Sequence, residues 1–368
     1  MEEKKVYLHK IATVVPETYY PQETALEIMK GLIAETDDMK KFLDKIYRGS
    51  AIDKRHTVID DYGKDPSEYR FYPKSRDLKP EPTPKMRNDV FIREAGRLSL
   101  EAVKKLLEKL PLLDKQRITH MITVSCTGFS APGFDLHIAK QLRLNPGIKR
   151  FHIGFMGCYA AFPAMNLAQS ICRADPAAKV LLVNAELCSI HFQQSRELEI
   201  IIANMLFADG LSAALISPDH EDSGGNKIIL HKFFTRYLGE TEDKMAWSIG
   251  DTAFDMKLSA YIPQILDENI QPVMADFYLG AGVRREEINL WAIHPGGRAI
   301  LDKLGKTLGL RREDISEAYE VLRDYGNMSS ATIMFLLEKI MGNERFGRMF
   351  SAAFGPGLTV ETAYMEKI

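Results

Sequence analysis

Apolar residues recur along this chain with two different periods, and the changes between them predict the order of its elements. Apolar runs as long as a strand, bounded by turn residues, are typical of buried strands. Such runs cover residues 6–14, 120–126, 151–156, 179–185 and 287–293. Helical segments are predicted over residues 22–48, 89–109, 136–142, 299–304 and 332–340, and the amphipathic spacing is clearest in 89–109. Strands that alternate with helices indicate an α/β protein with a largely parallel sheet.

Residues 61–88 interrupt this alternation. The segment combines many charged residues with a series of prolines, namely Pro66, Pro73, Pro80, Pro82 and Pro84. It lacks the glycine- and serine-rich composition of a flexible linker, so we expect an exposed excursion and not a domain boundary.

The length of the chain, 368 residues, is sufficient for two halves that each carry a core. We expect an N-terminal half over residues 1–220 and a C-terminal half over residues 221–368. The second half repeats the order of the first, because a strand that ends in His294-Pro295-Gly296-Gly297 resembles the strand that ends before Pro132-Gly133. Identity between the halves is slight, so we treat this as a structural similarity and not as an established repeat.

Cys158 is the residue around which the chain is organised. It follows the run at 151–156, and a helical segment with Pro163 in its first turn comes directly after it. A cysteine at a helix start faces the positive end of the helix dipole, and this setting favours the nucleophilic thiolate. The plainer interpretation of a single cysteine is a small buried hydrophobic residue.

His294 and Asn327 favour the catalytic interpretation of Cys158. His294 ends a predicted strand, and Asn327 opens a helix as Cys158 does. Cysteine, histidine and asparagine far apart in sequence are the pattern of a site that the fold assembles. Two halves packed together would bring all three residues to one cavity.

These three side chains suit a reaction of thioesters. A thiolate beside an imidazole forms an ion pair that keeps sulfur nucleophilic and able to accept an acyl group. Asn327 is a neutral donor, and a donor aimed at a developing oxyanion or enolate is typically worth about 3 kcal/mol. In a cysteine protease the asparagine would orient the histidine, whereas Asn327 begins its own helix and acts as an independent donor. This division of labour indicates decarboxylative carbon–carbon bond formation.

Composition narrows the possible functions. The formal net charge is -2, with 45% hydrophobic and 27% charged residues, which argues against nucleic acid as the main partner. The charged N-terminus lacks the core of a signal peptide, and no apolar stretch reaches membrane-spanning length. The four cysteines contain no C-x-x-C pair, so neither a disulfide framework nor a zinc site is predicted, and the expected location is the cytoplasm.

The chain resembles the type III polyketide synthases, the chalcone synthase-like branch of the thiolase superfamily. The resemblance covers nearly the whole length and is carried by these stretches in order: Gly157-Cys158, Leu206-Phe207-Ala208-Asp209-Gly210, Ile293-His294-Pro295-Gly296-Gly297, Tyr325-Gly326-Asn327-Met328-Ser329-Ser330-Ala331 and Phe354-Gly355-Pro356-Gly357-Leu358-Thr359-Val360-Glu361-Thr362. It implies a thiolase-like, five-layered αβαβα fold made of two pseudo-equivalent halves, and a homodimer. It also implies CoA thioesters as substrates, without a metal or prosthetic group.

The resemblance further implies a reaction and roles for single residues. Cys158 would carry the acyl starter and the growing chain, while His294 and Asn327 would drive decarboxylation of malonyl-CoA. Phe207 and Phe254 match the pair of gating phenylalanines between the CoA tunnel and the chamber. The expected activity is loading of an acyl-CoA starter, iterative condensation with malonyl-CoA, and cyclisation to a pyrone, resorcinol or related aromatic product.

Further residues are expected at the substrate pocket. Ala131 stands where plant members usually have a methionine that reaches into the partner's cavity, and Cys126 stands where they have a threonine. His191 replaces a small chamber residue, and it could crowd the cavity, bind a polyketide oxygen or turn away. Met245 aligns near another chamber wall, and Ser329 follows Asn327 in its motif.

Four basic residues cluster around the turn at Gly49-Ser50, namely Lys45, Arg48, Lys54 and Arg55. Their functional interpretation is a landing site for the phosphates of CoA. The alternative is an ordinary solvated face.

Three other functions share parts of this pattern. A single-round 3-oxoacyl synthase of the fatty-acid initiation type also uses cysteine, histidine and asparagine, but the motifs at His294 and Asn327 favour the iterative enzyme. A non-catalytic homologue would have lost one of the three residues, and none is lost. An HMG-CoA synthase-like enzyme needs a carboxylate near the thiol, and the spacing of Glu186 does not single it out. The starter, the number of extensions and the ring closure stay open.

Overall fold

The computed structural model describes residues 4–368, and a mixed β-sheet forms its centre. Within these residues nine strands pair in the order β11-β12-β13-β8-β1-β7-β6-β4-β5. Their bounds are β1 Tyr7–Val14, β4 His120–Ser125, β5 Lys149–Gly154, β6 Val180–Leu187, β7 Asp209–Ser217, β8 Ile228–Tyr237, β11 Leu290–Ile293, β12 Gly347–Gly355 and β13 Thr359–Lys367. Two short pairs stand apart from it: β2 Tyr19–Pro21 with β3 Lys54–His56, and β9 Met245–Ile249 with β10 Phe254–Leu258.

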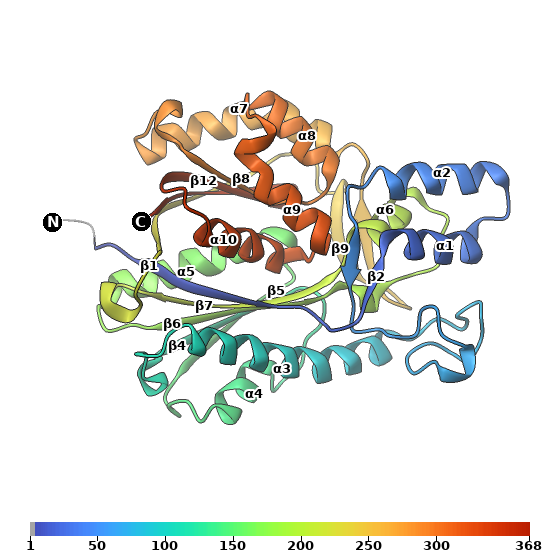
Figure 1. Ribbon diagram of the computed structural model, residues 1–368, viewed down its shortest axis with the longest axis horizontal. Helices are drawn as coiled ribbons and strands as arrows, with labels where there is room; N and C mark the ends of the chain where they lie inside the picture. The colour runs from blue at the N-terminus through green and yellow to red at the C-terminus, as the bar shows by residue number, and fades with distance from the viewer. Residues whose placement is uncertain (1–3) are drawn as a thin grey trace.

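Helices cover and separate the two parts of this sheet, as Figure 1 shows. The helices are α1 Gln22–Ile33, α2 Asp37–Arg48, α3 Pro84–Glu108, α4 Phe134–Gln141, α5 Ala161–Ala174, α6 Leu198–Leu206, α7 Ile262–Ala281, α8 Arg298–Thr307, α9 Ser316–Tyr325 and α10 Thr332–Gly342. Helices α3 and α4 lie outside one part of the sheet, α7 and α8 lie outside the other, and α5 and α10 lie between the two parts. The predicted αβαβα layering is therefore confirmed.

The sequence of α10 explains its central place. Eight of its eleven residues are buried, and Glu338 and Lys339 are the charged residues that reach outward, to Lys109 and Glu320. A helix with so wide an apolar surface is stable only when other elements cover most of it. The two parts of the sheet enclose α10 together with α5, and within residues 4–368 the sheet ladder that joins them is the pairing of β1 with β8, at Tyr7 with Ile229 and Leu8 with Ile228.

The prediction of a largely parallel sheet is wrong. Strand β4 runs parallel to β5 and β6, and β11 runs parallel to β12. The other described ladders of this sheet are antiparallel, including β1 with β7, β6 with β7, β8 with β13 and β12 with β13. Strands β7, β8, β12 and β13 were not among the predicted strands, and they form most of the antiparallel pairs.

The prediction of a buried strand at residues 151–156 is also wrong. Strand β5 covers Lys149–Gly154 and is largely exposed, because it lies at the edge of the sheet with β4 as its neighbour on one side. The apolar residues of this run are therefore exposed at the surface of the single chain.

The excursion over residues 61–88 is only partly exposed. Asp61 is fully buried, and its carboxylate accepts hydrogen bonds at 2.8 Å from the backbone N–H groups of Arg70, Phe71 and Tyr72. These bonds fold the segment back on itself, and α3 already begins at Pro84. The carboxylate replaces the hydrogen-bond partners that a loop otherwise finds in water.

Candidate active site

Cys158, His294 and Asn327 all line one cavity between the two parts of the sheet. Cys158 lies in the 3-10 turn Gly157–Tyr159 directly before α5, His294 follows β11, and Asn327 stands between α9 and α10. The structure therefore brings together the three residues that the sequence predicts, and the predicted place of Cys158 at a helix start is confirmed.

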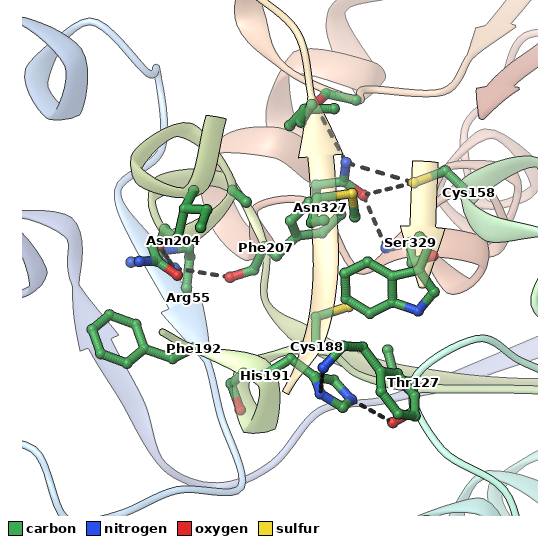
Figure 2. Close-up of a pocket in the computed structure, with 18 of the residues that line it drawn as sticks. Arg55, Thr127, Cys158, Cys188, His191, Phe192, Asn204, Phe207, Asn327 and Ser329 are labelled. Carbon is green, nitrogen blue, oxygen red and sulfur yellow. Dashed lines mark hydrogen bonds between the residues drawn. The ribbon is translucent and has the colours of Figure 1, made fainter. Parts of the chain in front are cut away.

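Gly157 fixes the position of the cysteine. Its φ is +79°, in the left-handed region that favours glycine. A Cβ at this residue would lie 2.5 Å from Cδ of Pro356, so a larger residue would force the turn away from the loop after β12. The turn places the Cys158 Sγ 3.9 Å from both the Oδ1 and the Nδ2 atoms of Asn327 (Figure 2).

The protein holds the Asn327 amide in one orientation. Its Nδ2 donates to the Gly296 carbonyl at 3.3 Å, and its Oδ1 accepts from the Ser329 N–H at 2.9 Å (Figure 2). The backbone of Asn327 forms a parallel β-bridge with Phe207. These bonds use one amide hydrogen and the carbonyl oxygen, and the second hydrogen of Nδ2 points to the Cys158 sulfur at 3.9 Å, a long contact that a ligand carbonyl beside the sulfur can replace.

His294 is buried, and neither of its ring nitrogens has a hydrogen-bond partner within the described residues. Burial lowers the pKa of His294 to about 3, so the imidazole is neutral. Burial likewise raises the pKa of the Cys158 thiol to about 11, although Ser329 and Asn327 counteract this shift. The loss of hydration thus disfavours both members of the expected thiolate–imidazolium pair, whereas the helix start favours the thiolate.

Glu186 contributes to the structure of this site, although its spacing in the sequence does not single it out. It lies fully buried in β6, where its carboxylate accepts from Ser330 Oγ at 2.5 Å, Thr127 Oγ1 at 2.9 Å and the Cys126 N–H at 3.1 Å. Burial raises the pKa of Glu186, and these donors oppose the shift. Polar residues inside the apolar run of β6 were the signal that could have found it.

Most predicted pocket residues also line the cavity. They are Phe207, Phe254, Cys126, His191, Met245 and Ser329. Cys126 Sγ lies 3.2 Å from Ser329 Oγ, which connects the end of β4 to the turn after Asn327. Ala131 is exposed and does not line the cavity of its own chain.

The four basic residues do not form one group. Lys45 is exposed, Arg48 pairs with Glu23 at 2.8 Å, and Lys54 lies over the Tyr19 ring at 5.1 Å. The prediction of a phosphate contact fails for Arg55, because this side chain faces inward.

Arg55 holds two elements of the cavity wall together. Its guanidinium donates to the carbonyls of Asn204 at 2.7 Å and Phe207 at 2.8 Å, and to Gln22 at 2.9 Å (Figure 2). These bonds fix the end of α6 next to α1.

No described helix is long and apolar enough to cross a membrane. The described residues also contain no group of three or more His, Cys, Asp or Glu side chains placed to hold a metal ion.

Comparisons with known proteins match the whole length of the chain. The model of the N-terminal domain of chalcone and stilbene synthases matches residues 2–220, and that of their C-terminal domain matches residues 230–368. The alpha-pyrone synthesis polyketide synthase-like Pks18 of Mycobacterium tuberculosis is 30% identical over 357 residues, which are 95% of this chain and 88% of that protein.

Two solved structures have the same fold. PKS-I from the brown alga Ectocarpus siliculosus is 27% identical with a TM-score of 0.89, and the match covers 100% of both chains. The 1,3,6,8-tetrahydroxynaphthalene synthase from Streptomyces coelicolor, a bacterial type III polyketide synthase, is 26% identical with a TM-score of 0.85 over 98% of this chain and 99% of that one.

The protonation state of Cys158 can be measured by alkylation with iodoacetamide and peptide mass spectrometry, with Cys158→Ser as the background control. Since the pKa of the thiol is raised, the thiolate fraction grows throughout the neutral range. We expect the rate at Cys158 to rise about tenfold per pH unit between about pH 6 and about pH 9. A rate that is already constant near neutral pH would instead demonstrate the ion pair.

Proposed function

This chain belongs to the chalcone and stilbene synthase family of type III polyketide synthases, and from that premise we propose that Cys158, His294 and Asn327 are its catalytic residues. The enzyme is an acyltransferase that condenses malonyl-CoA iteratively onto an acyl starter and cyclises the product. The observation that carries the assignment is the buried imidazole of His294, whose two nitrogens are unpaired in the cavity that Cys158 and Asn327 also line.

Loading of the starter begins from the neutral pair. When the acyl-CoA thioester enters, His294 accepts the proton of the Cys158 thiol, and the sulfur attacks the thioester carbonyl. The oxyanion receives a hydrogen bond from the Asn327 N–H that points to Sγ in the resting site. As the intermediate collapses, the bond to the CoA sulfur breaks and CoA leaves with the proton from His294.

Extension uses the same donors on a second thioester. The malonyl thioester carbonyl accepts hydrogen bonds from an N–H of neutral His294 and from Asn327 Nδ2. Loss of carbon dioxide leaves an enolate whose charge these two donors stabilise. The enolate carbon attacks the acyl group on Cys158, and the bond to Sγ breaks, so the chain grows by two carbons.

We also propose that residues 1–220 and 221–368 act as two halves of one catalytic unit. The first half supplies Cys158 and the second supplies His294 and Asn327, so neither half contains the complete site. The short pairing of β1 with β8 supports this division.

The remaining pocket residues are proposed as walls of the reaction chamber. Phe207 and Phe254 separate the chamber from the approach to it, and Cys126, Met245 and Ser329 line its inner side. The substrates bring CoA with them, and we propose that no resident cofactor takes part, because the thiol, imidazole and amide supply the required nucleophile, base and donors. All four cysteines of the described chain are free, which supports a reducing compartment such as the cytoplasm.

A homodimer is proposed from the surface beside β5. Phe129, Phe151 and Phe155 are 50%, 42% and 38% exposed, and β5 is an unpaired sheet edge. Aromatic side chains next to an open strand edge are typical of a surface that a partner covers. Ala131 lies in the exposed loop after Phe129, so a second copy docked here would meet this loop.

The CoA phosphates are proposed to lie near Lys45, Arg48 and Lys54, without Arg55. Lys45 and Arg48 lie at the C-terminal end of α2. Tyr47, also on α2, and Ile300 on α8 line the cavity, so this end of α2 lies beside an approach to the site. Arg48 shares its charge with Glu23 and Asp44, which leaves Lys45 as the freer cation.

The catalytic assignment can be tested with purified variants, malonyl-CoA and a panel of acyl-CoAs. Cys158→Ala is expected to form neither acyl adduct nor product. Asn327→Ala is expected still to accumulate the adduct on Cys158, although more slowly, and to lose malonyl decarboxylation by about 100-fold, since one donor to the oxyanion and the enolate is gone. The surface variant Asn145→Ala is the matched control, and mass spectrometry follows adducts and products.

Extended products from Cys158→Ala would overturn the covalent mechanism. A wild-type enzyme that adds a single two-carbon unit to every starter would favour the fatty-acid initiation enzyme. Unchanged decarboxylation in Asn327→Ala would remove this residue from the mechanism.

The proposed dimer is tested by light scattering after gel filtration. The wild-type protein is expected at twice the chain mass, and Phe151→Asp is expected at the monomer mass because a carboxylate cannot be buried unpaired in the interface. Leu112→Asp serves as the control, since Leu112 is an 85% exposed apolar residue outside this surface. A monomeric wild-type protein would contradict the proposal.

The phosphate contact of Lys45 is tested by kinetics with two forms of the malonyl thioester. Lys45→Ala is expected to raise KM for malonyl-CoA about fivefold at low ionic strength, with kcat changed by less than about twofold. With malonyl N-acetylcysteamine, which has no phosphates, the variant and the wild type are expected to behave alike. Lys85→Ala is the control, and an equal effect with both thioesters would argue against a phosphate contact.

A further inference from the structure

His191 occupies a place in the chamber where neither of its ring nitrogens can serve a substrate. It ends the 3-10 turn Cys188–His191 that follows β6. Its Nε2 lies 2.7 Å from the Thr127 carbonyl oxygen, and its Nδ1 lies 3.3 Å from the backbone nitrogen of Phe254 (Figure 2). The sequence leaves three roles open for His191: it could crowd the cavity, bind a polyketide oxygen or turn away. These contacts oppose the second role, because both ring nitrogens already have partners in the protein.

These two partners define the protonation of the ring. A carbonyl oxygen can only accept, so Nε2 carries the hydrogen, and a backbone N–H can only donate, so Nδ1 carries the lone pair. The imidazole is therefore neutral, with one defined tautomer. It joins the end of β4 to the first residue of β10.

The ring of His191 also packs against the hairpin formed by β9 and β10. It stacks on Phe254 with a centroid distance of 4.2 Å and an interplanar angle of 16°, and Trp247 meets it edge-on at 5.5 Å. The indole Nε1 of Trp247 donates to the Cys126 carbonyl at 2.7 Å. The carbonyls of two consecutive residues thus anchor both strands of the hairpin. That of Cys126 binds Trp247 on β9 directly, and that of Thr127 is linked to Phe254 on β10 through His191.

Other groups close the remaining sides of Phe254. The Nε2 of Gln193 donates to the Phe254 carbonyl at 3.3 Å, and the Nε of the buried Arg87 donates to the Thr252 carbonyl at 2.8 Å. The rings of Phe155 and Phe129 pack near Phe254 at 5.3 Å and 6.3 Å. Phe254 is consequently held through its backbone N–H, its carbonyl and its ring.

We propose that His191 is a positioning residue that fixes Phe254 as an immobile wall of the chamber, so that the length of the product is set on this side by the hairpin. A growing chain cannot shift the Phe254 backbone without breaking the bond to His191 Nδ1, and it cannot turn the Phe254 ring aside without losing the stacking on the imidazole that these bonds hold in place. The proposal rests on the proposed function only in taking this cavity as the place where the chain grows.

Two substitutions separate filling of space from hydrogen bonding. His191→Phe keeps an aromatic ring to stack on Phe254 but leaves the Thr127 carbonyl and the Phe254 N–H without a partner. His191→Gln offers one N–H and one oxygen and can restore both bonds. His220→Phe, at an exposed histidine, is the matched control.

Hydrogen–deuterium exchange tests the wall without reference to activity. In His191→Phe we expect peptides that span residues 245–258 to exchange about tenfold faster than in the wild type, since buried partners of a lost bond open more readily. His191→Gln is expected to return close to wild-type exchange. Peptides from β11 are expected to be unchanged in every variant.

Product analysis provides the functional readout. With one acyl-CoA starter, His191→Phe is expected to yield products at least one two-carbon unit longer than those of the wild type, and His191→Gln is expected to restore the original pattern. The proposal would be overturned if residues 245–258 of His191→Phe exchanged as slowly as in the wild type. It would also be overturned if His191→Phe and His191→Gln had the same exchange rates and the same products. If His191→Phe does not fold, Gln193→Ala loosens the same backbone carbonyl and is expected to accelerate exchange of the same peptides.

The two proposals can fail separately. A wild-type protein that forms no polyketide would refute the proposed function, while the exchange data would still decide whether His191 holds the hairpin.

Discussion

The buried carboxylate of Glu186 is the interaction on which the geometry of the site depends. It lies on β6 in the first half and accepts hydrogen bonds from Cys126 and Thr127 at the end of β4. It also accepts from Ser330, which follows Asn327 by three residues in the second half. One side chain thus connects β6 and the end of β4 to the turn that follows Asn327. A hydrogen bond to a charged group contributes about 1.5–3 kcal/mol, and these bonds offset part of the cost of burying the charge.

The same carboxylate influences the chemistry at a distance. Its negative charge is one of the causes, after burial, that raise the pKa of Cys158. A group that assembles the site therefore disfavours a resting thiolate. In the proposed mechanism, the thiolate therefore forms only when the thioester is in place and His294 accepts the proton. Such a site is protected from unproductive reactions of a free thiolate while it waits for substrate.

The sequence was sufficient to single out three residues that share one cavity, because each stands where an element begins or ends, and such places are marked by glycine and proline. It was also sufficient to predict α3, from its amphipathic spacing, and β6, from its continuous apolar run. It could not reveal that β5 is exposed, since an apolar run has the same composition whether its own chain or another covers it. Arg55 was grouped with the predicted CoA phosphate contacts because charge alone does not show which carbonyls lie nearby, and its partners Asn204 and Phe207 are distant in sequence. His191 depends in the same way on Thr127 and Phe254, which only the fold brings together.

The distribution of unused hydrogen-bonding capacity explains how this apolar cavity can select a thioester. Polar side chains of its wall are mostly occupied by the protein itself, as His191 is by Thr127 and Asn204 is by the carbonyl of Gln193. Among the described residues that line the cavity, His294 keeps both ring nitrogens unpaired, the Tyr47 hydroxyl is also unpaired, and one N–H of Asn327 has only the long contact to Cys158 Sγ at 3.9 Å. A ligand carbonyl that lies between His294 and Asn327 can therefore recover there part of the hydration it loses. A thioester carbonyl at that place is stabilised most when it carries negative charge, so the geometry that recognises the substrate also favours the enolate and the tetrahedral intermediate.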